Sequence, residues 1–205
     1  MDYVRPLEAV IPGARGRVLG VLARTELELT MRTVASLAGV SQNRANQVLN
    51  ELIDLGLVRR REAGSAALVV LDRENEAARA VQALADLREG VLSRLRADAA
   101  TLDPPPVSLI VFGSFAKGLA RTDSDIDVLA VSPVMTDADE ERWYDEVGRW
   151  AERASRIAGN PVNWIVATAQ EMPALLRRRG SVWDNIARDG IVLMGAAPSD
   201  LRGAA

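Results

Sequence analysis

Two aspartates one residue apart are the side chains best suited to chemistry. Asp125 and Asp127 belong to the run Ser-Asp-Ile-Asp at 124–127, which leads into the apolar stretch 128–131. Side chains alternate along a strand, so both carboxylates point the same way and Ile126 points to the opposite side. Adjacent carboxylates repel each other unless a cation lies between them, and divalent cations such as Mg²⁺ prefer oxygen ligands. The spacing therefore predicts a metal site.

A glycine-containing loop precedes these aspartates. The sequence GSFAKG at 113–118 follows directly on the apolar run 107–112, which predicts a buried strand. Gly113 allows the backbone to approach a bulky anion closely, Ser114 offers a hydroxyl donor, and a helix that begins here would direct N–H groups at phosphate. Lys117 is the only lysine of the chain. Its ammonium suits phosphate oxygens, although chance placement on an exposed helix is equally compatible with the sequence.

The composition narrows the chemistry further. The chain contains neither cysteine nor histidine, which excludes disulfides, thiolate zinc sites and catalysis by Ser-His-Asp or Cys-His groups. A metal must then be held by oxygen, which favours magnesium or manganese. A phosphate-binding backbone beside two carboxylates is what phosphoryl or nucleotidyl transfer needs, because that catalysis consists mainly of positioning and charge neutralisation.

The stretch GSFAKGLARTDSDIDVLAV resembles the signature of the DNA polymerase β-like nucleotidyltransferases in their minimal bacterial form, and the resemblance covers residues 104–195. It implies a mixed-sheet α/β domain that binds a nucleoside triphosphate, with ATP expected, together with Mg²⁺ or Mn²⁺. The reaction would move a nucleoside monophosphate onto a hydroxyl of a protein or small molecule and release pyrophosphate. The implied residues are Gly113, Ser114, Lys117, Gly118 and Ser124 for the nucleotide, and Asp125 and Asp127 for metal binding and catalysis.

The sequence departs from that family at one position. Active members carry a third carboxylate on a later strand, and Asn163 occupies the matching place in the run 161–167. Asparagine is nearly isosteric with aspartate, but it is neutral, coordinates metals weakly and cannot act as a base. Glu171 lies past the strand end and is a poor geometric substitute. The departure affects turnover more than nucleotide binding.

The remaining periodicity of this region predicts a helix over 137–157, a strand over 162–167, a helix from Gln170, and a closing helix and strand over 186–195. Core packing is the expected role of the tryptophans, and a base-stacking platform is the alternative. They are Trp143, Trp150, Trp164 and Trp183.

The N-terminal part has a different pattern. Helices are predicted over 15–24 and 31–38, with Thr30 as N-cap of the second, and a short strand lies between them. A third helix opens at Ser41, and a hairpin of 57–61 and 66–71 flanks the turn 62–65. The apolar face of the third helix consists of Ala45, Val48, Leu49, Leu52 and Leu55.

This layout resembles the winged helix-turn-helix of bacterial repressors over residues 12–72. The resemblance implies binding to double-stranded DNA, with the third helix in the major groove and the wing along the backbone. The candidate DNA-contacting residues are Gln42, Asn43, Arg44, Asn46, Arg59, Arg60 and Arg61. A merely solvated polar face, or a module for protein interaction or dimerisation, remains the alternative.

The expected organisation is a winged helix over 1–72, a helical connector over 73–103, a nucleotidyltransferase-like domain over 104–197 and a tail over 198–205. The connector helix, 76–99, is weakened at Gly90 and is either a spacer or a dimerisation helix. Residues 1–72 carry a net charge of +1 and the rest −4, which is compatible with DNA binding by the first module. The sequence shows no signal pattern and no apolar run of about 18 residues, so a cytoplasmic protein is expected.

The fold class is therefore α/β (α+β) with two domains. Three functions remain open: a metal-dependent nucleotidyltransferase coupled to DNA binding, a transcriptional regulator whose transferase-like domain senses a nucleotide, and an interaction protein that has repurposed both modules. The intact Asp125 and Asp127 favour the first, and Asn163 favours the second. The acceptor, the base preference and a homodimeric state are left open.

Overall fold

A computed structural model describes residues 1–64, 66–178 and 180–203. The chain divides into two compact units. The first unit is Arg5–Leu87, and the second joins Met1–Val4 to the chain from Arg88 onward. Among the described residues, no helix combines the length and the apolar character that a membrane span requires.

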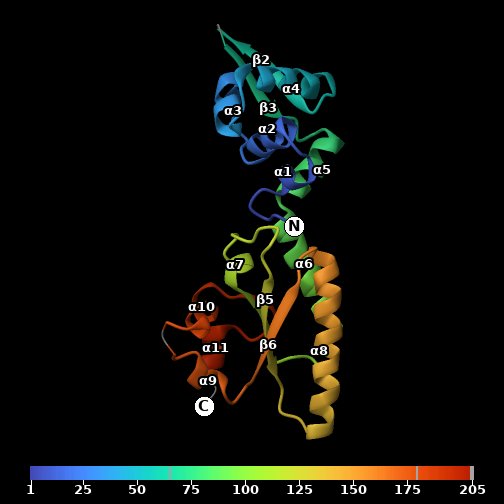
Figure 1. The fold of residues 1–205 in the computed structure, drawn as a ribbon, viewed down its shortest axis with the longest axis vertical. Helices are drawn as coiled ribbons and strands as arrows, with labels where there is room; N and C mark the ends of the chain where they lie inside the picture. Colours follow the sequence, from blue (N-terminus) through green and yellow to red (C-terminus); the bar gives the residue numbers. More distant parts are fainter. Residues whose placement is uncertain (65, 179, 204–205) are drawn as a thin grey trace. The chain divides into compact units, whose positions relative to one another are not determined.

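The first unit is a winged helix (Figure 1). Its three-stranded sheet has the order β1-β3-β2, and both pairings are antiparallel. The strands are β1 (Leu29–Thr30), β2 (Val58–Ala63) and β3 (Ala66–Leu71). The helices are α1 (Pro6–Val10), α2 (Ala14–Ala23), α3 (Met31–Ala38), α4 (Gln42–Asp54) and α5 (Glu76–Ala85). The turn predicted at 62–65 shortens, because β2 continues to Ala63; Ser65 lies outside the described residues.

Side-chain caps fix the helix-turn-helix. Thr30 accepts a hydrogen bond from the backbone N–H of Thr33, which confirms it as the N-cap of α3, and Ser41 does the same for α4 through the N–H of Arg44. Between the helices Gly39 has φ 61°, in the left-handed region that favours glycine. The two caps and this glycine set where α3 ends and α4 begins.

The core of this unit includes Leu22, Val34 and Leu49, and helix α5 completes it through the buried Ala78. The placement of Leu55 on the apolar face of the third helix is wrong. Helix α4 ends at Asp54, and the Leu55 side chain after it is 61% exposed.

The second unit contains a mixed four-stranded sheet of order β6-β5-β4-β7. Strands β5 and β6 are parallel, and the other two pairings are antiparallel, as the predicted mixed α/β fold requires. The strands are β4 (Ser108–Phe112), β5 (Ile126–Ser132), β6 (Val162–Thr168) and β7 (Ile191–Gly195). The helices are α6 (Leu87–Ala99), α7 (Gly113–Ala116), α8 (Asp137–Ala158), α9 (Met172–Leu175), α10 (Val182–Asp189) and α11 (Pro198–Gly203).

Helices cover both faces of this sheet. Figure 1 shows α6 and α8 on one side and α9, α10 and α11 on the other. Trp143 and Trp150 of α8 are fully buried, so these two tryptophans belong to the core. Leu201, in the region expected to be a tail, is also buried as part of α11.

The helix expected over 76–99 is interrupted at Asp86 and not at Gly90, which lies inside α6. The apolar stripes of its two halves pack in different units. Ala78 of α5 belongs to the first core, whereas α6 carries Leu92 and Leu95, which are buried in the second unit. The region expected to be a connector is thus divided at residue 87.

Candidate functional sites

The aspartate pair lies where three strand ends meet. Asp125 immediately precedes β5, and Asp127 is the second residue of that strand. Asp127 pairs with Phe112, the last residue of β4, on one side and with Asn163 of β6 on the other. Asp125 and Asn163 are exposed, and Asp127 is half-buried. The arrangement presents oxygen-bearing side chains at one end of the sheet.

Gly113 is held directly against Asp127. Its φ is 73°, and a Cβ added at this position would collide with Oδ2 of Asp127 and lie 3.2 Å from Cγ. Glycine is therefore required here both by the backbone conformation and by the neighbouring carboxylate. The expected reason for this glycine was closeness to an anionic ligand, and the close approach in the structure is to Asp127.

The electrostatics of the pair favour a nearby cation. Burial, and secondarily the charge of Asp125, raise the pKa of Asp127 above its usual range. A positive ion would offset both effects by stabilising the ionised form. Asn163 Nδ2 donates a hydrogen bond of 2.8 Å to Oδ2 of Asp125, so the amide group contacts the other carboxylate of the pair directly.

A third acidic side chain is not part of this cluster. Within the described residues, no group of three or more His, Cys, Asp or Glu side chains is arranged to hold a metal ion. Glu171 follows the far end of β6, whose last residue, Thr168, lies about 16 Å along the strand from Asn163 at 3.3 Å per residue. It accepts hydrogen bonds from the N–H and the hydroxyl of Thr168, and these bonds lower its pKa. Glu171 therefore lies too far away to replace the missing carboxylate.

The other residues predicted to bind the nucleotide belong to α7 and to the loop that follows it. The helix after Gly113 is a single turn, α7, and Ser114 within it is half-buried. Lys117 Nζ lies 3.4 Å from a carboxylate oxygen of Asp189, at the end of α10, and is thus engaged in an ion pair. Ser124 accepts a hydrogen bond of 2.9 Å from the N–H of Arg121, which closes the loop between α7 and β5.

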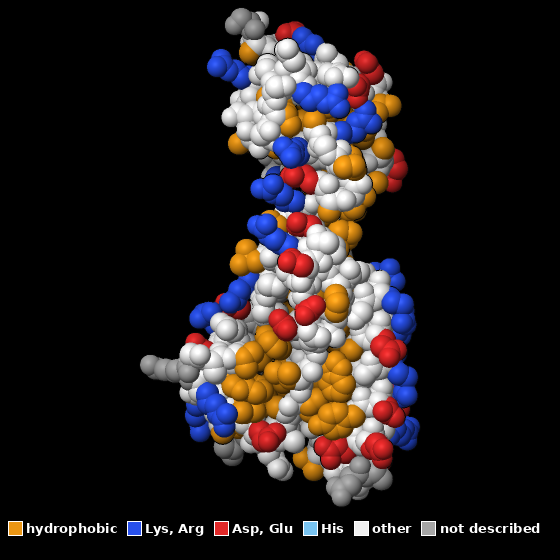
Figure 2. All heavy atoms as spheres, viewed as in Figure 1, with side chains coloured by type: hydrophobic (Ala, Val, Ile, Leu, Met, Phe, Trp, Pro, Cys, Tyr) orange, Lys and Arg blue, Asp and Glu red, His pale blue; other side chains and the backbone are white. Residues whose placement is uncertain are grey.

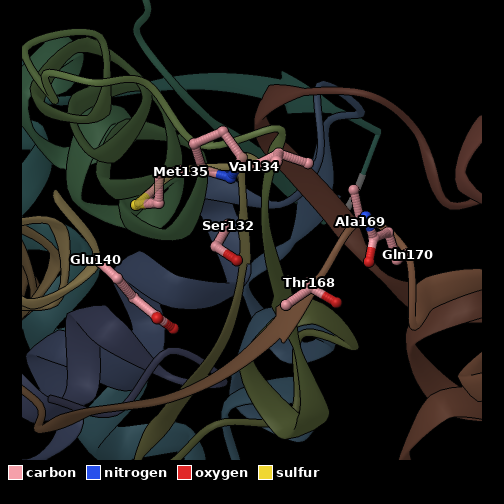
Figure 3. Close-up of a pocket in the computed structure, with 8 residues that line it drawn as sticks. Ser132, Val134, Met135, Glu140, Thr168, Ala169 and Gln170 are labelled. Carbon is pink, nitrogen blue, oxygen red and sulfur yellow. The ribbon is translucent and has the colours of Figure 1, made fainter. Parts of the chain in front are cut away.

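A separate pocket of about 170 Å³ lies at the opposite end of the same strands. Figure 3 shows Ser132 and Thr168, the last residues of β5 and β6, together with Glu140 of α8 on its wall. The pocket therefore does not include the aspartate pair.

The predicted DNA-contacting side chains of α4 lie on its polar face. Gln42, Asn43 and Arg44 are exposed, and Asn46 is half-buried. Their polar groups engage one another along the helix: Gln42 donates to Asn46 at 2.9 Å, and Arg44 donates to Gln47 at 2.7 Å. The face is polar and largely solvent-accessible, and its contact with DNA stays a prediction.

The three wing arginines on β2 are exposed, and each has an acidic partner within the unit. Arg59 pairs with Asp72 at 3.7 Å, Arg60 with Glu62 at 2.7 Å, and Arg61 with Glu28. Figure 2 shows that basic (blue) and acidic (red) side chains are mixed on the visible face of this unit. Exposed ion pairs such as these contribute little to stability.

Two residues that contact the Gly-Ser loop were missed by the sequence analysis. Arg88, at the start of α6, donates from Nε to the carbonyl of Phe115 at 2.8 Å. Tyr3 packs the edge of its ring on Phe115, with the ring centroids 4.7 Å apart. Both contacts join residues far apart in the chain, and no local sequence pattern predicts them.

Together these features define the class of protein. A capped helix-turn-helix with an antiparallel wing accompanies a mixed sheet in which a Gly-Ser turn abuts a strand that begins Asp-x-Asp. Residues 11–67 match the family model of the MarR family, and residues 92–179 match that of the nucleotidyltransferase domain. The two matches confirm the predicted fusion of a winged-helix module with a nucleotidyltransferase domain. No curated protein and no solved structure matches it.

Proposed function

We propose that this protein is a DNA-binding regulator whose nucleotidyltransferase domain binds a nucleoside triphosphate with Mg²⁺ or Mn²⁺ and transfers its nucleotidyl group slowly or not at all. The observation that carries the proposal is the pairing of Asp127 with Asn163, where active members of the resembled family have a third carboxylate. ATP is the expected nucleotide.

The binding half of the proposal rests on the Gly-Ser loop and the aspartates. Gly113 and Ser114 would receive the phosphates, and Asp125 and Asp127 would hold the metal. When bound, the metal would neutralise charge on the phosphates. The raised pKa of Asp127 supports this fit, because a cation would relieve the cost of its ionisation. Lys117 would exchange Asp189 for a phosphate oxygen.

Transfer requires more than binding. An acceptor hydroxyl oxygen would form a bond to the α-phosphorus, the bond from that phosphorus to the bridging oxygen would break, and pyrophosphate would leave with the electron pair. The hydroxyl proton must pass to a base. Asn163 cannot accept it, and the loss of general-base help typically slows a reaction about 10²–10⁴-fold.

A metal-dependent nucleotidyltransferase that acts on a protein or small-molecule hydroxyl is the second candidate. The observation in its favour is that Asp125 and Asp127 are both present beside Gly113. An acceptor that brings its own base, or whose hydroxyl is readily deprotonated, would make the missing carboxylate less important.

The DNA-binding half rests on the exposed polar face of α4 and on the arginines of β2. In the proposed complex α4 enters the major groove and the wing arginines contact phosphates. A homodimer would present two such helices to a palindromic site, and we include it in the proposal.

Calorimetric titration of ATP, GTP, CTP and UTP, each with and without Mg²⁺, followed by a pyrophosphate-release assay on the same sample, tests the proposal. Magnesium-dependent binding with very slow release is expected. The double variant Asp125→Asn/Asp127→Asn should lose binding, whereas Asp123→Asn, an exposed aspartate of the same loop, should retain it. Unchanged affinity in the double variant would refute the site, and brisk release by the wild type would favour the transferase.

A further inference from the structure

The chain passes between the two units at two places, and each is close in sequence to a residue that contacts Phe115 within the nucleotidyltransferase unit. The first is the bond between Val4 and Arg5, and the second is the bond between Leu87 and Arg88. Tyr3 stands two residues before Arg5, and Arg88 directly follows the second crossing. Both side chains contact Phe115 of α7.

Tyr3 anchors the segment Met1–Val4 to the second unit. Its side chain is only 6% exposed, and its ring stands edge-on to that of Phe115 at an interplanar angle of 87°. Its hydroxyl donates to the carbonyl of Ala158 at 2.5 Å, and its backbone N–H donates to the carbonyl of Ala120 at 3.0 Å. Ala120 belongs to the loop that joins α7 to the aspartate pair.

Arg88 links the start of α6 to the same helical turn, α7. Its Nε donates to the carbonyl of Phe115, and its Nη2 donates to that of Ala116. The guanidinium carbon lies 5.8 Å from the centroid of the Phe115 ring. Two N–H groups of the planar guanidinium thus bind the two carbonyls at the end of α7. A lysine ammonium could not reproduce this forked geometry.

Helix α7 depends on these contacts for its position. It has four residues, and so short a helix is unstable by itself because nucleation fixes several dihedral angles for a single hydrogen bond. Phe115 is fully buried, which ties the turn to its surroundings. A ligand that shifts Gly113 or Ser114, at the other end of the turn, would therefore act on the contacts of Tyr3 and Arg88.

We propose that occupancy of the Gly-Ser loop by a magnesium–triphosphate and the state of the winged-helix unit are coupled, with Tyr3 and Arg88 as the positioning residues that connect them. This inference rests on the proposed function, because it needs a triphosphate at that loop. Coupling between two binding sites is reciprocal, so DNA and triphosphate would change each other's affinity by the same factor, typically about 5–150-fold.

Hydrogen–deuterium exchange of the full chain, with and without Mg²⁺ and each of the four triphosphates, tests the coupling. In the wild type, the segment 112–119 should be protected by the bound triphosphate. Exchange in α1 and α5, which belong to the other unit, should change about fivefold or more. The variant Arg88→Gln should keep the protection of 112–119 and lose the response of α5. Arg94→Gln, at an exposed arginine of the same helix, should behave as the wild type.

The outcomes separate the two proposals. Absence of protection at 112–119 with every triphosphate would overturn the proposed function, and the coupling with it. Protection there with unchanged exchange in α1 and α5 would overturn the coupling alone. A normal α5 response in Arg88→Gln would show that this arginine is not the connection. If Arg88→Gln does not fold, Arg88→Lys, which keeps the charge and lacks the fork, takes its place.

Discussion

Replacing Asn163 by aspartate isolates the effect of the missing carboxylate. The change keeps the side-chain volume nearly constant, removes the 2.8 Å hydrogen bond to Asp125, and adds a negative charge beside Asp127. A hydrogen bond to a charged group contributes about 1.5–3 kcal/mol, and less at an exposed site such as this one. Two like charges about 4 Å apart repel by about 1 kcal/mol in water and more where solvent is partly excluded. In the presence of a chelator we expect Asn163→Asp to lower the free energy of unfolding by about 1–3 kcal/mol.

Magnesium should reverse this loss, because three carboxylates bind the ion more tightly than two. A ligand present at a hundred times its dissociation constant stabilises the folded state by about 2.7 kcal/mol, which is the size of the loss. Urea unfolding with EDTA and with Mg²⁺ measures both terms. Asn163→Ala is the matched control, since it removes the donor to Asp125 without adding charge. Any pyrophosphate release should also rise in Asn163→Asp.

The reasoning fails if magnesium stabilises the wild type, Asn163→Asp and Asn163→Ala equally. It also fails if Asn163→Asp is as stable as the wild type in EDTA, because a third carboxylate would then not be close to the other two.

Three further predictions concern other residues. Gly113→Ala should cost about 1–2 kcal/mol for the left-handed conformation alone, and should also displace Asp127 and abolish magnesium–triphosphate binding; calorimetry that finds full affinity would contradict this. Burial raises the pKa of Tyr3 from 10.0 to about 12, so its stabilising contribution is complete below pH 10 and is lost as the pH rises toward 12. In that window, urea unfolding of the wild type should lose more stability than that of Tyr3→Phe, and parallel curves would argue against a buried phenol. Arg60→Gln should weaken DNA binding regardless of sequence and reduce the slope of log affinity against log salt by about one, and an unchanged slope would remove Arg60 from the phosphate contacts.

Local signals predicted much of the winged helix. The caps Thr30 and Ser41, with the periodic apolar residues after them, were enough to place α3 and α4. The sequence placed the end of the third helix at Gly56 and so counted Leu55 on the apolar face, whereas α4 ends at Asp54. Helix α1, with five residues, is too short to show a period, and the interruption at Asp86 reflects packing in different units, which a single helical pattern does not contain.

The residues of the candidate site also differ in whether local sequence signals could predict them. Asp125, Asp127 and Gly113 lie within one short motif, and the structure brings them together. Asn163 was found through the resemblance, and the parallel register of β5 and β6 sets it beside Asp127. Their roles toward nucleotide and metal remain predictions. Arg88 and Tyr3 could not be anticipated, because their contacts with α7 exist only after distant parts of the chain have packed.

The division of the chain means that the winged-helix unit is inserted between Val4 and Arg88 of the nucleotidyltransferase unit. Separating the two by cutting at residue 87 would leave the downstream fragment without the Tyr3 ring that packs on Phe115, and would expose the otherwise buried Phe115 side chain. Such a fragment would be expected to bind hydrophobic dyes and to aggregate. A fragment in which residues 1–4 are joined directly to residue 88 would keep the contacts of Tyr3 with Phe115 and Ala158. It would be the better starting point for studying the isolated nucleotidyltransferase domain.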